Sequence, residues 1–221
     1  MNLIFLHGAL GSNAQWEDIC KLLPNTFNIH CINFPQHGNN ETILGNYSIE
    51  TLANTVEQYI ETKQLQKCIL IGYSLGGYVA LWLAAKNPDY LLKVITLATK
   101  FTWDNDAILF ESKKLSLENL LPIKERLIAM HVVGLDLLLL ITTQIIASIA
   151  HNYLNEKVLS NINSPVLLMV GEIDKMVSQQ ETKQYGSFIK NAKVEILPLQ
   201  PHLINKMESE LIVKYIVGFI I

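Results

Sequence analysis

The chain has 221 residues, of which half are hydrophobic, and its formal net charge is −3. This length and apolar content suit one domain with a large core and room for an inserted subdomain. The mildly acidic balance and the single arginine argue against an extended basic surface for nucleic acid. The three cysteines are an odd number without close spacing, which is typical of reduced thiols in the cytoplasm.

The first part of the chain alternates short apolar runs with longer helical ones. Residues 3–6 and 28–32 predict strands, and residues 14–22 and 49–63 predict helices. The N-terminus has no basic region of the kind that opens a secretory leader, so residues 3–6 are interpreted as a strand and not as a signal peptide. Strands that alternate with helices predict a parallel sheet with helices on both faces.

The most informative motif follows the next predicted strand, residues 68–71. Residues 72–76 read Gly-x-Ser-x-Gly, and a helix is predicted to start within the motif and to cover residues 75–87. A serine on such a strand-to-helix turn is raised above the sheet edge, and the helix N-terminus favours the negative charge of an oxyanion. An ordinary glycine-rich turn is the alternative, but the strand before and the helix after favour Ser74 as a nucleophile.

The alternation stops after a predicted strand over residues 93–97. Residues 101–161 are helical in character, so we expect a helical cap inserted into a core formed by residues 1–100 and 162–221. Within this segment, the apolar run over residues 132–150 approaches the length of a membrane span. Asp136 and other polar residues recur there at helical spacing, which predicts a buried helix and no membrane span.

Leucine and isoleucine dominate the expected cap, above all over residues 135–141. They suit an apolar acyl chain or a small aromatic group of a substrate, and packing within the cap is the alternative. The basic side chains of this segment include Lys113, Lys114, Lys124 and Arg126. We interpret them as a solvated face, and contact with an acidic acyl-carrier protein is the alternative.

Two further candidate residues follow the last two predicted strands. These strands cover residues 166–170 and 193–197, and the helices after them cover residues 179–189 and 208–219. Asp174 follows the first strand and His202 the second, and parallel strands bring their carboxyl ends to one sheet edge, beside Ser74. His202 would take the serine proton and Asp174 would orient its ring, with Glu172 as the local competitor for that role.

A tetrahedral intermediate also needs two N–H donors, and backbone donors leave no side-chain signature. The N–H of Leu75, directly after the nucleophile, is one. The other is expected in the loop after the first strand, residues 7–12, where Ala9 is inferred from its position alone.

Together these features resemble the α/β-hydrolase superfamily over essentially the whole chain. The motifs that carry the resemblance are His7-Gly8, Gly72-Tyr73-Ser74-Leu75-Gly76-Gly77, Gly171-Glu172-Ile173-Asp174 and Pro201-His202. The resemblance implies a mostly parallel sheet of about six strands, a helical cap and a Ser74–Asp174–His202 triad. It also implies that the N–H of Ala9 completes the oxyanion hole with that of Leu75, and that no metal or cofactor is needed.

One turn departs from the family pattern. Residues 33–38 resemble the family's Asp-x-Pro-Gly-His-Gly turn, but Asn33 stands in place of its Asp and Gln36 in place of its first Gly. By resemblance, His7 and His37 are structural.

The sequence therefore predicts a cytoplasmic serine hydrolase, monomeric or homodimeric, that acts on a small carboxylic ester or thioester. Its elbow resembles those of small carboxylesterases, of the pimeloyl-carrier methyl esterase and of the lyase that makes a menaquinone precursor. That lyase typically has Arg where this chain has Tyr78. A lyase or carbon–carbon bond hydrolase that uses the same triad, and a catalytically idle binding protein, are the alternatives.

Overall fold

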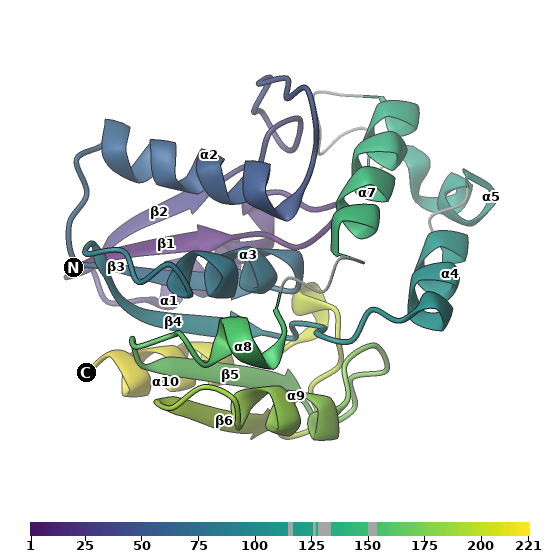
Figure 1. Cartoon of the computed structure of the whole chain (residues 1–221). Coiled ribbons are helices and arrows are strands. Elements are labelled where there is room, and N and C mark those ends of the chain that lie inside the picture. The colour runs from purple at the N-terminus through teal and green to yellow at the C-terminus, as the bar shows by residue number, and fades with distance from the viewer. Residues whose placement is uncertain (115–116, 126, 128–133, 150–153) are drawn as a thin grey trace.

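The computed structural model of the protein contains a six-stranded sheet in which all neighbouring strands are parallel (Figure 1). It describes residues 1–114, 117–125, 127, 134–149 and 154–221. In chain order the strands are β1 (Asn2–Leu6), β2 (Asn28–Ile32), β3 (Cys68–Tyr73), β4 (Leu91–Leu97), β5 (Val166–Gly171) and β6 (Ala192–Leu197). Their order across the sheet is β2-β1-β3-β4-β5-β6. The predicted α/β fold with about six strands is therefore confirmed.

Helices cover both faces of this sheet (Figure 1). They are α1 (Glu17–Leu22), α2 (Ile49–Thr62), α3 (Leu75–Ala84), α8 (Glu156–Leu159), α9 (Gln179–Gly186) and α10 (Ser209–Ile220). Helices α2, α3 and α8 share one hydrophobic cluster with one face of the sheet, and α1 and α10 share a second cluster with the other face. Helix α3 ends three residues before its predicted end, because Asn87 has a positive φ and precedes a proline.

The sequences of the inner strands β1 and β3 fit burial on both faces. In β1, Leu3 and Phe5 belong to the cluster with α1 and α10, whereas Ile4 and Leu6 belong to the other cluster. Every residue of β3 is buried, which explains its continuous apolar run. Side chains can therefore reach a ligand just beyond the carboxyl ends of the strands. The loops after β1, β3, β5 and β6 carry the candidate site residues.

The segment between β4 and β5 forms helices beyond the carboxyl end of the sheet, where Figure 1 shows α4, α5 and α7. These are α4 (Asn105–Lys114), α5 (Leu117–Leu120), a 3₁₀ turn (Leu121–Ile123) and α7 (Leu135–Ile149). Helix α7 is tied to the core because the Ile49 N–H donates to the Ser148 hydroxyl at 3.0 Å and the Tyr47 N–H to the Gln144 side chain at 3.3 Å. The division into a core and a cap of residues 101–161 stays a prediction.

None of the helices that the structure describes is both long and apolar enough to cross a membrane. Helix α7 occupies the middle of the apolar run predicted as a buried helix, and it buries eight of its 15 residues. The ends of that run, Val132 and Ala150, lie outside the described residues.

Candidate active site

Ser74 lies on a strained turn between β3 and α3. Its φ of 50° falls in the left-handed region that side chains rarely adopt. The turn is held because the Ser74 N–H donates to the Leu97 carbonyl at 2.8 Å and the Gly77 N–H to the Ser74 carbonyl at 3.0 Å. A Cβ atom on Gly76 would lie 2.2 Å from the Leu6 carbonyl oxygen, so only glycine lets α3 approach β1 this closely.

His202 and Asp174 form a direct pair at the ends of β6 and β5. The Nδ1–H of His202 donates to Asp174 Oδ2 at 2.8 Å, and the other carboxylate oxygen accepts the N–H groups of Met176 at 2.7 Å and Val177 at 2.9 Å. The Asp174 side chain is fully buried, whereas that of His202 is 14% exposed. This arrangement leaves Nε2 of His202 as the nitrogen that can take a proton.

The loops that carry this pair are tied to each other. The Ile173 N–H donates to the Gln200 carbonyl at 3.1 Å, and the Leu199 N–H donates to the Glu172 carboxylate at 2.9 Å. Glu172, the competing carboxylate, is therefore occupied with the loop after β6, while Asp174 meets His202. A third tie comes from Tyr73, whose hydroxyl donates to the His202 carbonyl at 3.2 Å. Burial raises the pKa of the Tyr73 phenol well above its usual range, so it remains a donor.

The loop after β1 presents backbone N–H groups beside Ser74. The Gly8 N–H donates to the side-chain oxygen of Gln15 at 2.9 Å, and the Gly11 N–H closes a turn onto the Gly8 carbonyl at 3.1 Å. Within the described part of the chain, the N–H groups of Ala9 and Leu75 donate to no protein acceptor, and both residues line the same cavity as Ser74. Two unused donors at this place can receive an oxyanion.

This cavity has a volume of about 290 Å³ and lies between the sheet edge and the helices α4, α5 and α7. Its lining includes Ala9, Gln15, Tyr73, Ser74, Leu75 and His202 from the core, and Leu120, Thr142, Ile145, Ile146 and Ile149 from the helices. Among the described residues, the Ser74 hydroxyl makes no hydrogen bond to His202. Such contacts are often long without substrate and tighten when it binds.

The turn of residues 33–38 shows how the two departures from the family pattern are accommodated. Asn33 Oδ1 accepts the Asn13 N–H at 2.6 Å, and its amide nitrogen donates to the Asn39 side chain at 2.8 Å. Gln36 has a φ of 61°, and its amide donates to the carbonyls of Glu41 at 2.7 Å and Thr42 at 3.1 Å. These bonds support a conformation that glycine adopts without strain.

His7 and His37 take part in backbone contacts of the core. Nε2 of His7 accepts the Phe34 N–H at 3.0 Å, its Nδ1–H donates to the Gly8 carbonyl at 2.8 Å, and Nδ1–H of His37 donates to the Pro35 carbonyl at 2.9 Å. Both rings are fully buried. These contacts fit the structural role that the resemblance implies, because the His7–Phe34 bond joins the loop after β1 to the loop after β2 and the other two bonds brace each loop.

Sequence reasoning missed three groups of the cavity wall. Gln15, which fixes the Gly8 N–H, has no signal beyond its place seven residues after that glycine. Lys100 lies three residues after the end of β4, and its place in the sequence does not show that it lines the cavity. Lys114 is exposed, as expected for a solvated face, but it also pairs with the buried Glu111 at 3.0 Å, three residues earlier on α4, and both line the cavity.

Lys113 and Lys124 are exposed, and Arg126 lies outside the described residues. No group of three or more His, Cys, Asp or Glu in the described residues is arranged to hold a metal ion.

Comparisons with known proteins place the chain in context. Residues 2–122 match the family model described as the alpha/beta hydrolase fold. The pimeloyl-[acyl-carrier protein] methyl ester esterase of Aeromonas salmonicida is 35% identical over 99 residues, which are 44% of this chain and 37% of that protein. A probable alcohol acetyltransferase of Cyberlindnera fabianii is 34% identical over 89 residues, which are 39% of this chain and only 24% of that protein.

A solved structure extends the likeness over the whole chain. A thermophilic esterase from Thermogutta terrifontis superposes with a TM-score of 0.83 and 19% identity, covering 100% of this chain and 89% of the other. At this identity the likeness concerns the fold.

Proposed function

This chain belongs to the alpha/beta hydrolase fold family, and from that premise we propose that it is a cytoplasmic serine esterase that cleaves a carboxylic ester or thioester. The observation that carries the proposal is the cavity in which Ser74, His202 and the free N–H groups of Ala9 and Leu75 meet. A buried carboxylate on the far side of His202 completes the set of groups that acyl transfer requires.

In the proposed mechanism, Ser74 Oγ attacks the carbonyl carbon while Nε2 of His202 takes its proton. Asp174 holds the ring in the required tautomer and stabilises the imidazolium that forms. The oxyanion is received by the N–H groups of Ala9 and Leu75. His202 then gives its proton to the leaving group, and a water that it activates releases the acyl group from Ser74.

The cavity supports an apolar acyl group as substrate. Ile145, Ile146 and Ile149 from α7 face the cavity that also holds Ser74. Apolar walls with few polar groups are typical of sites that take acyl chains. The names of an esterase and an acetyltransferase among the relatives support acyl chemistry and leave open whether water or an alcohol receives the acyl group. The free Cys20, Cys31 and Cys68 support the cytoplasmic location.

The direct test is hydrolysis of p-nitrophenyl esters from acetate to decanoate by the wild type and by Ser74→Ala. We expect Ser74→Ala to lose about 10³-fold or more in turnover with the fold kept, because the nucleophile is absent. Ser187→Ala is the matched control, because Ser187 lies at the C-terminal end of α9 and is exposed to solvent. Intact-mass detection of an acyl adduct that is absent in Ser74→Ala would add the covalent step.

Two rival functions give different results in the same experiment. A lyase or carbon–carbon bond hydrolase would depend on His202 but form no acyl adduct on Ser74. An idle binding protein would hydrolyse no ester at all. Ester hydrolysis that persists at near-normal rate in Ser74→Ala would contradict the proposed mechanism.

A further inference from the structure

The cavity beside Ser74 has one wall that carries charge. The apolar wall comes from α7, with Ile145 and Ile146. The charged wall comes from the end of β4 and from α4, with Lys100, Glu111 and Lys114. A charged side chain beside an apolar cavity costs free energy unless another group pairs with it. The partners of these three side chains therefore decide the charge of the wall.

Two of the three charges neutralise each other. Nζ of Lys114 lies 3.0 and 3.2 Å from the two carboxylate oxygens of Glu111. The Glu111 side chain is only 10% exposed and that of Lys114 is 45% exposed. The pair therefore brings no net charge to the cavity wall.

Lys100 is the charge that remains. Its Nζ donates to the Met176 carbonyl at 3.4 Å and lies 5.9 Å from the centre of the Trp103 ring. In the part of the chain that the structure describes, no carboxylate lies within ion-pair distance of Lys100. The neighbouring Glu181 is used otherwise, since it accepts the N–H groups of Phe101 and Thr102. Among the described residues, the cavity wall thus holds one cation more than it holds anions.

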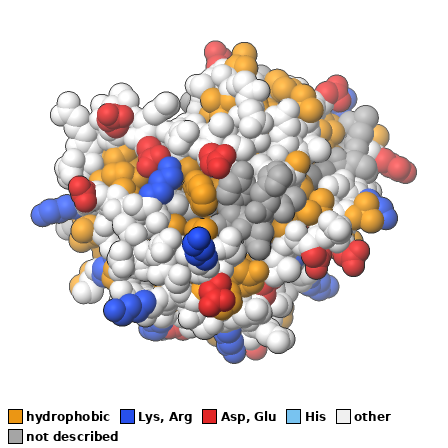
Figure 2. All heavy atoms as spheres, in the orientation of Figure 1, with side chains coloured by type: hydrophobic (Ala, Val, Ile, Leu, Met, Phe, Trp, Pro, Cys, Tyr) orange, Lys and Arg blue, Asp and Glu red, His pale blue; other side chains and the backbone are white. Residues whose placement is uncertain are grey.

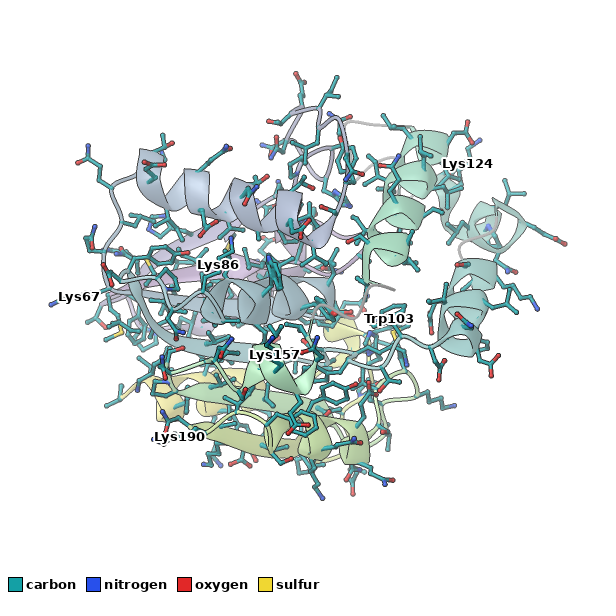
Figure 3. All side chains as sticks on the ribbon, viewed as in Figure 1. Lys67, Lys86, Trp103, Lys124, Lys157 and Lys190 are labelled. Atoms are coloured by element: carbon teal, nitrogen blue, oxygen red, sulfur yellow. The ribbon has the colours of Figure 1, made fainter. Side chains whose placement is uncertain are left out.

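The chain around Lys100 contacts both the Ser74 turn and the loop that carries Asp174. Lys100 follows Thr99, whose hydroxyl donates to the Ser74 carbonyl at 3.3 Å. Its ammonium group contacts Met176, whose N–H in turn binds Asp174. Figure 3 shows Trp103 between the sheet and α4, on the same short stretch of chain as Lys100.

We infer that Lys100 binds a carboxylate on the substrate, so the preferred substrates are esters whose acyl chain ends in a carboxylate. In such a molecule the methylene groups lie along α7 while the carboxylate meets the ammonium group. This inference rests on the proposed esterase function and names its substrate class, monoesters of aliphatic dicarboxylic acids. Lys100 is a specificity-determining residue in this scheme and takes no part in the proton transfers.

The test compares each monomethyl ester of the dicarboxylic acids from succinate to suberate with the neutral methyl ester in which a methyl group replaces the carboxylate. Wild type, Lys100→Met and Lys190→Met are assayed by release of methanol. Lys190 is the matched control because it is exposed, and Figure 3 shows it well away from Trp103. We expect the wild type to prefer the anionic ester of at least one chain length.

For that ester, Lys100→Met should lower kcat/KM by about tenfold or more, while the neutral partner changes by less than about threefold. Lys190→Met should leave both unchanged. Rising ionic strength should reduce the preference of the wild type for the anionic ester, because salt screens the pair of Lys100 and the substrate carboxylate where water reaches it. A wild type that prefers the neutral esters, or an equal fall for both esters in Lys100→Met, would overturn the inference.

A binding measurement separates this inference from the proposed function. Calorimetric titration of Ser74→Ala with the free dicarboxylates requires no turnover. If Ser74→Ala binds the dicarboxylate and Ser74→Ala/Lys100→Met does not, the anion site is supported, whether or not the wild type cleaves an ester. A wild type that cleaves no ester would contradict the proposed function alone. Absence of dicarboxylate binding, or binding that survives the loss of Lys100, would overturn the inference while esterase activity stands.

Discussion

The sheet edge and the helical segment between β4 and β5 are built differently. On the sheet side, the Asp174 side chain is fully buried, and Asp174, His202 and Tyr73 are linked by hydrogen bonds between loops. On the helical side, large apolar side chains remain exposed, namely Leu109, Phe110, Leu121, Leu137 and Leu140. Figure 2 shows apolar side chains on the surface among charges of both signs. Under the proposed function, the hydrogen-bonded sheet edge carries the reacting groups, and the helices supply most of the apolar lining of the cavity.

The largest effect is expected from breaking the sheet side of this comparison at Asp174. Asp174→Asn should lower kcat for p-nitrophenyl butyrate by about 10³- to 10⁴-fold, because the amide no longer favours the His202 tautomer that accepts the serine proton. Asp106→Asn is the control, because Asp106 is an exposed acid on α4. It should change kcat by less than about twofold, since substitutions at exposed positions usually have small effects. A variant that keeps a tenth of wild-type activity would contradict the role of Asp174.

Glycine substitutions test the difference in packing between the two sides. Gly76→Ala would place its Cβ against the Leu6 backbone, and we expect a loss of about 3 kcal/mol in the free energy of unfolding. Gly134→Ala, before α7, meets nothing within 4 Å and should change stability by less than about 0.5 kcal/mol. Urea titration followed by circular dichroism measures the free energy of unfolding of both variants. Equal losses in Gly76→Ala and Gly134→Ala would contradict the expected difference in packing.

A substitution on α7 should alter selectivity and spare the chemistry. Ile146 lines the cavity and is 7% exposed, so Ile146→Phe should fill part of it. We expect kcat/KM for the decanoate ester to fall about tenfold while that for the acetate ester stays nearly constant. Leu140→Phe, on the exposed side of the same helix, is the control. A parallel fall for both esters would place Ile146 in the catalytic machinery instead.

The smallest effect on activity is expected away from the cavity, at the thiols of Cys20 on α1 and Cys31 on β2. Cys20 and Cys31 lie 3.5 Å apart, and a hydrogen bond from Cys20 lowers the pKa of Cys31, whereas burial raises the pKa of Cys68 to about 11. Because a lower pKa means more thiolate at a given pH, iodoacetamide at pH near 8 should label Cys31 before Cys68.

The Cys20→Ala variant checks the cause of this reactivity. It removes the donor, so the pKa of Cys31 should rise and its labelling should slow, as peptide mass spectrometry would show. Ester hydrolysis should be unchanged by Cys20→Ala, since these thiols do not line the cavity. Faster labelling of Cys31 in Cys20→Ala would contradict the proposed hydrogen bond.

Much of the fold was open to prediction because its signals are local. The apolar run of β3 and the turn at residues 72–76 indicate a buried parallel strand that enters a helix. From the order of strands, Ser74, Asp174 and His202 were expected at one edge, and the structure brings His202 and Asp174 to 2.8 Å. Their catalytic roles remain predictions.

What the sequence by itself determined is therefore the set of elements and the side chains at their ends, since periodicity and turn chemistry act over a few residues. Which side chains meet across the cavity was decided by tertiary structure alone. Gln15 binds the Gly8 N–H, and Lys100 has no carboxylate partner among the described residues, whereas the Glu111–Lys114 pair is a local contact three residues apart on α4. The Gln15 contact depends on how the 3₁₀ turn of Asn13–Trp16 lies against the sheet edge, and the surroundings of Lys100 depend on the loop after β5. Such placement leaves no mark in local sequence.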